Sequence, residues 1–495
     1  MKKLLGLCLS AILALTAVFG ATACSTTSAN DYSEYTDDGR LILTIWAPDQ
    51  YANATIRSRF QAWLDDFNET DEIKELGVYL EFSPFTQLPT TLSTACISGP
   101  HMMPDIVIWD RFATPSNTTY LMPIDDLLEE DNIDTSVFLD EAYDELTVNG
   151  SQYGLPLDAD PWGIYVNMDI VNTYNDQNSA SAIDVDSLDT WSELIDAADK
   201  LTIRDGSNVT RSGLNTTSAD GQFFSFVYTG TGELIDTDEN SSAYGDTVMS
   251  TDSADIFTDG ESMRVYDTLA FFKELYALNL CNTGHGGTDA FGNGLLAMTY
   301  GSIYFPQELS SYSIKNYKML PYPARDLTYI NVNTEQGAHG ESLVASETDS
   351  TGMQNGQVGG MLGGYGLAIP QPVMENMRTD EWRSHVEKAW EVIKLWLLDD
   401  EMNESYFTAN EVITCRSDLW NNAFYTENTG VIGDILPYLE NYKMRPSVAG
   451  YEVFESSIVR ADIQMLKEGS LTVLATYEKI RDDGNALLRQ AQGRS

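Results

Sequence analysis

Apolar strands and amphipathic helices alternate in the first part of the sequence, between residues 40 and 110. The segments RLILTIW at 40–46, GVYLEF at 77–82 and PDIVIW at 104–109 each fit a buried strand. Between the first two segments, Ile56, Phe60, Trp63, Leu64 and Phe67 recur at helical spacing. A short helix is expected at LPTTLSTACISG, before the third strand. This order predicts a parallel α/β sheet.

Aromatic and charged residues stand where each of these strands ends. They are Trp46 and Asp49, then Phe85, then Trp109, Asp110 and Arg111. Because ligands of parallel α/β sheets bind beyond the carboxyl ends of the strands, these residues predict a binding surface. The alternative for Trp46 and Trp109 is a place in the core, and for Asp110 and Arg111 a surface ion pair.

Further candidate binding residues lie later in the chain. Asp160 and Trp162 come just before the apolar run at 164–166. A pyranose has an apolar face, on which aromatic rings stack, and a rim of hydroxyls that charged and amide groups bond. The mixture of aromatic and charged candidates therefore favours a sugar. Weaker candidates, for which core or loop roles are equally open, are Tyr228, Tyr304, Tyr365 and Arg416.

Length and charge narrow the possibilities further. A chain of 495 residues exceeds one ordinary hydrophobic core, so two or more lobes are expected. Its 28 Lys and Arg against 75 Asp and Glu give a formal net charge of −47. Such a chain repels nucleic acid and anionic lipid headgroups. The acidity is also compatible with a cationic ligand, although a solvated acidic surface is the simpler interpretation.

The N-terminus has the features of a secretory signal. Lys2 and Lys3 precede an apolar run at 4–20, and ATAC follows at 21–24. We interpret residues 1–23 as a lipoprotein signal peptide and Cys24 as the lipid-bearing residue. The polar stretch at 24–40 is then a flexible tether. The alternative is an ordinary signal peptide with Cys24 incidental to cleavage.

The common catalytic and metal-binding motifs are missing from the sequence. The four histidines are not in zinc spacing, and neither a phosphate-binding loop nor GxSxG is found. Asp236, Asp238 and Asn240 alternate as in a calcium loop but lack its glycine and glutamate, which favours a solvated hairpin. We expect neither cofactor nor metal. The remaining cysteines, which we expect in the core, are Cys96, Cys281 and Cys415.

Three local patterns predict secondary structure outside the first strands. The dipeptide Asn149–Gly150 predicts a β-hairpin turn. A helix is expected at 187–202, with Asp189 or Thr190 as cap and Glu193 completing a capping box. Gly469–Ser470 divides the tail into two helices.

Taken in order, several segments resemble family 1 of the extracellular solute-binding proteins of bacterial ABC transporters, which includes maltose-binding proteins. The segments are LTIWAPDQ, PDIVIWDRFATP, YLMPIDDLL, VNGSQYGLPLDADPWGIYVNMDIV, TWSELIDAADKLT, GNGLLAMTYGSIYF, GGYGLAIP and AWEVIKLWLL. The resemblance implies a two-lobed periplasmic-binding-protein-like fold of type II, with a ligand cleft between α/β lobes joined by crossing strands. It implies a first lobe at 41–158 and 318–403 and a second at 159–317 and 404–495.

The resemblance also implies roles for individual residues. Sugar contacts are implied for Trp46, Asp110 and Arg111 in the first lobe and for Asp160 near the crossover. Tyr304 or Phe305 stands where relatives have a stacking tryptophan, and Asp49 or Gln50 is the nearest polar candidate after Trp46.

The function implied by the resemblance is binding rather than turnover. A lipid-anchored, monomeric protein on the outer face of a Gram-positive-type membrane would capture a carbohydrate, with an oligosaccharide as the expected ligand, and deliver it to an ABC permease. Two alternatives stay open at this point. One is a binding protein for a cationic peptide or polyamine, and the other is a glycosidase that uses paired carboxylates.

Overall fold

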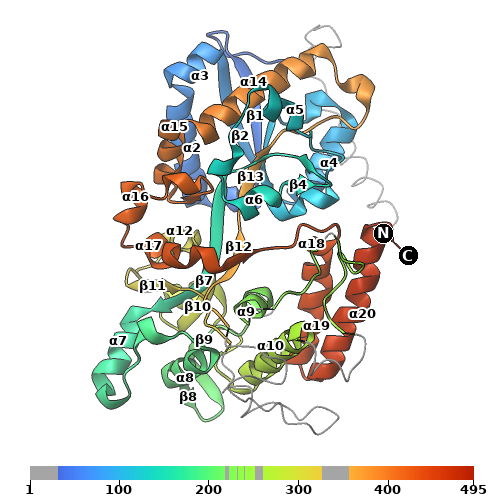
Figure 1. Cartoon of the computed structure of the whole chain (residues 1–495). Helices are drawn as coiled ribbons and strands as arrows, with labels where there is room; N and C mark the ends of the chain where they lie inside the picture. Colours follow the sequence, from blue (N-terminus) through green and yellow to red (C-terminus); the bar gives the residue numbers. More distant parts are fainter. Residues whose placement is uncertain are drawn as a thin grey trace, which may run out of the picture.

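Two α/β lobes, joined by crossing strands, make up the molecule (Figure 1). The computed structural model describes residues 32–217, 222–230, 232–238, 240–250, 260–325 and 356–494. The expected signal peptide, Cys24 and the first part of the expected tether lie outside the described residues.

The sheet of the first lobe has the strand order β2–β1–β3–β13–β6. Its strands are β1 (Leu41–Pro48), β2 (Val78–Phe85), β3 (Ile106–Asp110), β6 (Leu155–Pro156) and β13 (Tyr365–Ala368). Strand β1 is parallel to β2 and β3, so the carboxyl ends of these three strands share one edge. The predicted parallel sheet and the common edge of Trp46, Phe85 and Asp110 are confirmed.

Helices pack on both faces of this sheet. They are α2 (Ala54–Asn68), α3 (Asp71–Leu76), α4 (Leu88–Ser98), α5 (Asp125–Glu130), α6 (Asp140–Asp144), α14 (Asp380–Leu398) and α15 (Asp400–Asn410). The predicted apolar stripe of α2, from Ile56 to Phe67, is buried. The hairpin predicted at Asn149–Gly150 is present as β4 (Thr147–Val148) and β5 (Ser151–Gln152).

The second sheet has the order β15–β12–β7–β10–β9–β8, and β11 and β14 pair with β7 outside this path. Its strands are β7 (Asp158–Asn167), β8 (Ile203–Asp205), β9 (Asn208–Leu214), β10 (Leu296–Ser302), β11 (Tyr317–Leu320), β12 (Gly360–Gly363), β14 (Ile413–Thr414) and β15 (Tyr442–Met444). Cys96 and Cys415 are buried as expected, whereas Cys281 is half-buried.

The remaining helices belong to the second half of the fold. They are α7 (Met168–Gln177), α8 (Trp191–Leu201), α9 (Phe223–Thr229), α10 (Gly260–Ala277), α11 (Gly287–Gly292), α12 (Phe305–Glu308), α16 (Ala423–Thr426), α17 (Val431–Ile435), α18 (Tyr451–Val453), α19 (Arg460–Lys467) and α20 (Val473–Ala491). Thr190 caps α8 and forms the predicted capping box with Glu193. Helices α19 and α20 are the two expected in the tail.

Three connections carry the chain between the sheets. Strand β7 leads into the second sheet, and the chain returns between β12, which ends at Gly363, and β13, which begins at Tyr365. After α15 the chain crosses again through β14, which pairs with β7. The first lobe was expected to resume at residue 318, but β11 and β12 both pair with β7 and so belong to the second sheet. The boundary expected near residue 404 also differs, because α15 packs against α2 and α14 of the first lobe.

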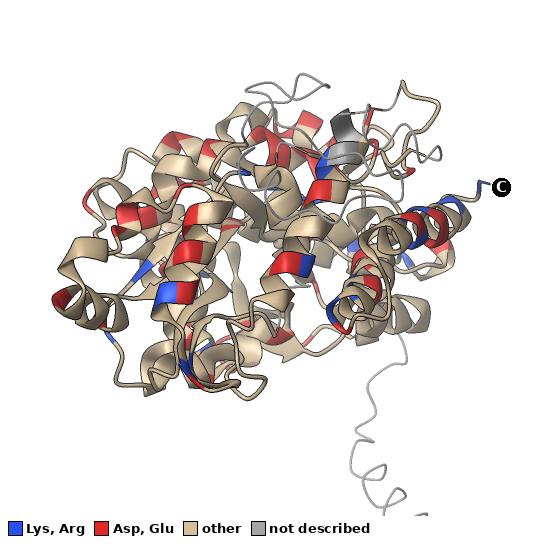
Figure 2. Ribbon diagram, turned by 90° about the horizontal axis from the view of Figure 1, so that it is seen from below, with Lys and Arg blue, Asp and Glu red and all other residues tan. Residues whose placement is uncertain are grey.

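The acidic residues are spread over many helices and loops rather than gathered in one patch (Figure 2). Lys and Arg are fewer and many lie close to Asp or Glu. This distribution agrees with a solvated acidic surface. Within the described ranges, no helix combines the length and the apolar character that crossing a membrane requires.

Candidate functional site

A cleft with two adjoining chambers lies between the sheets. The central chamber, of about 570 Å³, is lined by residues of both lobes that include Asp110, Asp160, Trp162, Tyr365 and Arg445. The side chamber, of about 460 Å³, is lined by residues that include Asp49, Asn215, Tyr304 and Glu308. Gln50, Trp162 and Tyr300 line both chambers, so the two form one cleft.

The sequence folds so that each sheet contributes one wall of the cleft. In the first lobe, Gln50 follows β1, Asp110 ends β3 and Tyr365 begins β13. In the second lobe, Trp162 lies on β7 and is paired with Ser302 on β10, the strand that carries Tyr300. The cleft is therefore at the carboxyl edge of the first sheet, where the sequence predicted it.

An ion pair joins the two lobes across the central chamber. Arg445, directly after β15, donates from Nη2 to Asp110 Oδ1 at 2.8 Å. Its guanidinium carbon lies 3.4 Å from the centre of the Phe112 ring, in the geometry of a cation–π contact. Burial raises the pKa of Asp110, and the charges of Arg445 and Arg111 oppose this shift. Asp110 thus meets a counter-charge supplied by the other lobe.

A second carboxyl in the central chamber has an unusual protonation equilibrium. Burial, followed by the charge of Asp158, raises the pKa of Asp160 to about 8. Asp160 Oδ1 accepts a hydrogen bond from the backbone N–H of Ile303 at 3.2 Å. At neutral pH this carboxyl is therefore mostly protonated, and it offers a ligand a hydrogen-bond donor as well as an acceptor.

Unsatisfied polar atoms lie where the two chambers meet. Tyr300 is buried and its hydroxyl has no hydrogen-bond partner among the residues that the structure describes. The same holds for the amide nitrogen of Gln50, whose Oε1 accepts from the Tyr365 hydroxyl at 2.6 Å. Because a buried polar group without a partner is costly, these atoms are suited to bond a ligand with hydroxyl groups.

Arg111 does not line the cleft, and its predicted ligand contact is corrected. The side chain is fully buried, and Nε donates to Glu145 Oε2 at 2.9 Å. Its other nitrogens donate to the backbone carbonyls of Asp158, Gly363 and Tyr365. These carbonyls lie where β7, β12 and β13 pass between the sheets. Arg111 is therefore a structural anchor of the crossing strands.

Three other candidates also have structural positions that contradict a ligand contact. Trp109 is fully buried in the core beneath α4, because β3 turns this side chain away from the cleft edge. Tyr228 packs in the core of the second lobe. Arg416 is buried and donates to Asp400, Asp418 and the last carbonyls of α14, so it caps that helix.

The aromatic pair at the strand ends is close to the edge but outside both chambers. The rings of Trp46 and Phe85 are 4.2 Å apart and pack on each other, and both are half-buried. Tyr304 lines the side chamber, but its hydroxyl donates to Asp158 Oδ2 at 2.7 Å. The structure places five other predicted residues in the lining of the cleft. They are Asp49, Asp110, Asp160, Trp162 and Tyr365.

The sequence analysis missed several residues that line the cleft. These residues lie far in sequence from the strand ends predicted between residues 40 and 110. They are Gln222, Tyr300, Arg445 and Glu455. Tyr300 directly precedes GSIYF, the segment in which the resemblance implied Tyr304 or Phe305 as a contact, and this position is a usable signal. Arg445 follows a strand that the sequence did not predict. In the described part of the chain, no three His, Cys, Asp or Glu are grouped to hold a metal ion.

Comparison with known proteins places this geometry in a family. Three similar solved structures are the GacH receptor of Streptomyces glaucescens, an ABC substrate-binding protein of Listeria monocytogenes in complex with cycloalternan, and the sugar-binding protein MalE of Xanthomonas citri. Their TM-scores are 0.65, 0.64 and 0.63, at 16%, 14% and 14% identity. They cover 90%, 92% and 91% of this chain, and 98%, 99% and 98% of their own.

The structural matches show a shared two-lobed fold. A search of curated proteins found no significant match. The profile of the bacterial extracellular solute-binding proteins matches residues 51–372, well over half of the chain. With this match and an interlobe cleft at the predicted edge, the chain belongs to the family of bacterial extracellular solute-binding proteins.

Proposed function

We propose that the protein binds a neutral carbohydrate, an oligosaccharide, in the cleft and delivers it to the permease of an ABC importer. The observation that carries this proposal is the lining of the cleft. Trp162, Tyr300 and Tyr365 provide aromatic surface, and Gln50, Asp110 and the protonated Asp160 provide hydrogen-bonding groups on both walls. Such a mixture fits the apolar face and hydroxyl rim of a pyranose.

The relatives support the same ligand class. The Streptomyces protein is described in complex with acarbose and the Listeria protein with cycloalternan, and other solved relatives hold mannobiose, mannotriose, maltose or maltotriose. All of these are oligosaccharides or close analogues. The proposal concerns the class of ligand and not one of these sugars.

The alternative of a cationic ligand finds less support in the cleft than in the total charge. Asp110 is bonded to Arg445, and Asp160 is mostly protonated at neutral pH. The third carboxyl of the central chamber, Glu455, is offset by Arg445 and Arg460, which line the same chamber. The chamber therefore lacks the strongly negative lining that a polyamine or basic peptide requires.

The proposal extends to the setting of the protein. We infer that Cys24 carries a lipid and that the protein binds without turnover. We infer too that the expected tether at 24–40 joins the monomeric body to the outer face of the membrane. Its later part packs on the first lobe, where the Ser33 hydroxyl donates to Glu381 Oε1 at 2.7 Å. The strand pairing supports a first lobe at 41–157 and 364–412 and a second lobe at 158–363 and from α17 to residue 494. The segment after β14 lies between them, and its Arg416 caps α14.

A thermal-shift panel tests the ligand class. We expect acarbose, malto-oligosaccharides, manno-oligosaccharides or cycloalternan to raise the melting temperature, whereas spermidine and basic peptides leave it unchanged. A ligand that binds only the folded state at a hundred times its Kd adds about 2.7 kcal/mol of stability. A shift with cations alone would overturn the carbohydrate proposal. Chromatography of each sugar after incubation tests turnover, since cleavage products would contradict a binding protein.

A further inference from the structure

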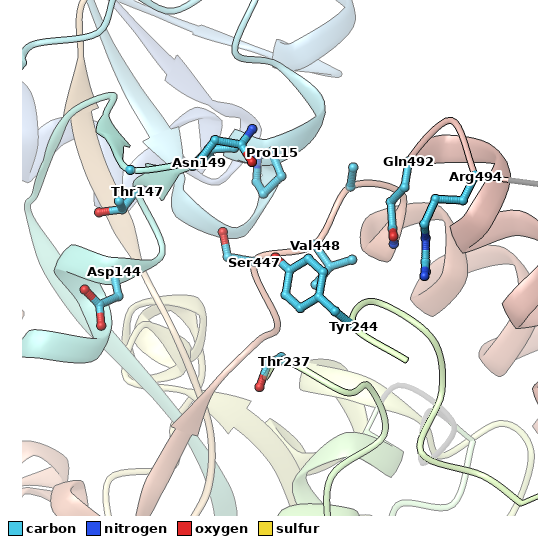
Figure 3. A pocket seen from close by; sticks show the side chains of 13 residues that line it. Pro115, Asp144, Thr147, Asn149, Thr237, Tyr244, Ser447, Val448, Gln492 and Arg494 are labelled. Atoms are coloured by element: carbon cyan, nitrogen blue, oxygen red, sulfur yellow. The ribbon is translucent and has the colours of Figure 1, made fainter. Parts of the chain in front are cut away.

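A second hollow lies between the lobes, beside the cleft and apart from it. This lateral pocket, of about 870 Å³, is larger than either chamber of the cleft. Its first-lobe wall is Pro115, Asp144 and the β4–β5 hairpin, and its second-lobe wall includes Thr237, Tyr244, residues 447–449, Gln492 and Arg494. Figure 3 shows these side chains arranged around the hollow from both lobes.

The lateral pocket and the central chamber share two segments of chain. Asp110, at the end of β3, lines the central chamber, and Pro115, five residues later in the short helical segment that follows, lines the lateral pocket. Likewise Arg445 lines the chamber and Ser447 lines the pocket. The Asp110–Arg445 ion pair therefore stands at the boundary between the two hollows. Because the Asp110 side chain is 37% exposed, a ligand in the central chamber can reach this pair.

The lining of the lateral pocket suits an uncharged ligand with many hydroxyls. Tyr244, Val448 and Pro115 provide apolar surface, and amide and hydroxyl groups of Asn149, Gln492, Thr147, Thr237 and Ser447 surround them. The lining has one carboxylate, Asp144, and one guanidinium, Arg494, which already pairs with Asp246 at 2.6 Å. This composition is that of a sugar-binding surface and not of an ion-binding one.

Hydrogen bonds and a tight turn hold both walls of the lateral pocket in place. Asn149 and Gly150 have φ values of 52° and 79°, as in the tight turn of a two-residue hairpin. Behind the hairpin, the Gln152 amide donates to the carbonyls of Tyr143 and Gly154. In the other wall, the Gln492 amide donates to the Gly245 carbonyl at 3.1 Å. Such walls need little ordering when a ligand binds.

We propose that the lateral pocket is a second carbohydrate subsite, which holds the units of an oligosaccharide that extend past the Asp110–Arg445 pair. The cleft holds the first units, and the lateral pocket adds affinity only for chains long enough to reach it. The inference rests on the proposed function of the cleft and names the ligand as a chain of several sugar units. Because the two walls of the lateral pocket belong to different lobes, a long oligosaccharide would contact both lobes there as well as in the cleft.

Titration calorimetry with a length series tests the inference. The probes are malto-oligosaccharides and manno-oligosaccharides of two to seven units, with the wild type and two variants of the full chain. Asn149→Gly removes one side chain and keeps a residue that adopts positive φ without strain. Tyr244→Ala removes the aromatic surface. The matched control is Tyr35→Ala, because Tyr35 is exposed and pairs with Leu41 at the start of β1, the end opposite the cleft.

We expect both variants to bind the shortest sugar as the wild type does. For the longest sugars, affinity falls by about tenfold in Tyr244→Ala and by about threefold in Asn149→Gly. Equal affinity at every length, or an equal loss at every length, would overturn the subsite. If the wild type binds no sugar of any length, the proposed function itself fails. If Tyr244→Ala lowers the melting temperature, the length dependence of Asn149→Gly alone decides between these outcomes.

Discussion

At the scale of single residues, Arg111 shows how a predicted contact residue serves the frame of the site instead. Its guanidinium bonds Glu145 and three backbone carbonyls at the crossing of β7, β12 and β13. Arg111→Ala leaves the buried Glu145 without its counter-charge. We expect the free energy of unfolding to fall by about 3–5 kcal/mol in urea denaturation.

A matched control for this change is Arg204→Ala. Arg204 pairs with Asp199 at 2.8 Å, but the two side chains are 29% and 59% exposed. Its removal should cost less than about 1 kcal/mol, because exposed ion pairs contribute little. Equal effects of the two substitutions would show that Arg111 does not anchor the crossing strands.

Asp160 predicts a specific dependence of stability on pH. Its folded-state pKa of about 8 lies well above that of an unfolded aspartate, mainly because of burial. Between these two values the folded protein binds more protons than the unfolded chain, so this group lowers stability as pH rises towards 8. We expect Asp160→Asn to lose less stability than the wild type between pH 5.5 and 8.5. Parallel curves from denaturation at these pH values would contradict the assignment.

At the scale of elements, the crossing of β12 into β13 depends on one glycine. Gly364 has φ +134°, and a Cβ there would lie 2.2 Å from the Asp158 carbonyl oxygen and 2.7 Å from Arg111 Nη1. Gly364→Ala should therefore disturb the crossing strands, lower the melting temperature and weaken sugar binding. Gly39→Ala is the control, because Gly39 has φ +86° with nothing within 4 Å of its Cβ position. A similar small effect of both changes would show that the crossing tolerates a side chain.

The same elements show what the sequence can predict. Strand β1, helix α2 and the β4–β5 hairpin follow from periodicity and turn residues within short windows, and the structure confirms them. Arg111 and Arg445 could not be assigned in this way. Their partners lie far off in the chain: Gly363 is 252 residues from Arg111, and Asp110 is 335 residues from Arg445. Whether a strand-end residue is buried or lines a cleft depends on such distant partners.

Trp109 shows that the sequence also fails to predict burial for two neighbouring residues of one strand. Trp109 and Asp110 are neighbours on β3, and alternate residues of a strand point to opposite faces. The sequence identified the strand end but not which of the two side chains faces the cleft. The sheet places Trp109 against α4 and leaves Asp110 at the edge, where Arg445 meets it.

At the scale of the whole molecule, three contacts of one segment join the second lobe to the first beside the cleft. They are the Asp110–Arg445 ion pair, the hydrogen bond from Ser447 Oγ to the Glu145 carbonyl at 3.2 Å, and the bond from Gly450 N–H to Ser116 Oγ at 3.3 Å. All three join the segment at 445–450 to the first lobe. The lobes are thus in contact through this segment, and hinge motion about the crossing strands would separate these partners.

We expect sugar to shift the molecule from an open to a closed form, and Arg445→Met to favour the open form. Arg445→Met keeps an apolar side chain over Phe112 but removes the charge that bonds Asp110. In small-angle X-ray scattering without sugar, Arg445→Met should then have a larger radius of gyration than the wild type. Addition of sugar should reduce the radius of both proteins. Lys443→Met is the control, because Lys443 pairs with Glu233 within the second lobe. Saturable binding by calorimetry with no change in radius in any of the three proteins would show that binding does not close the lobes.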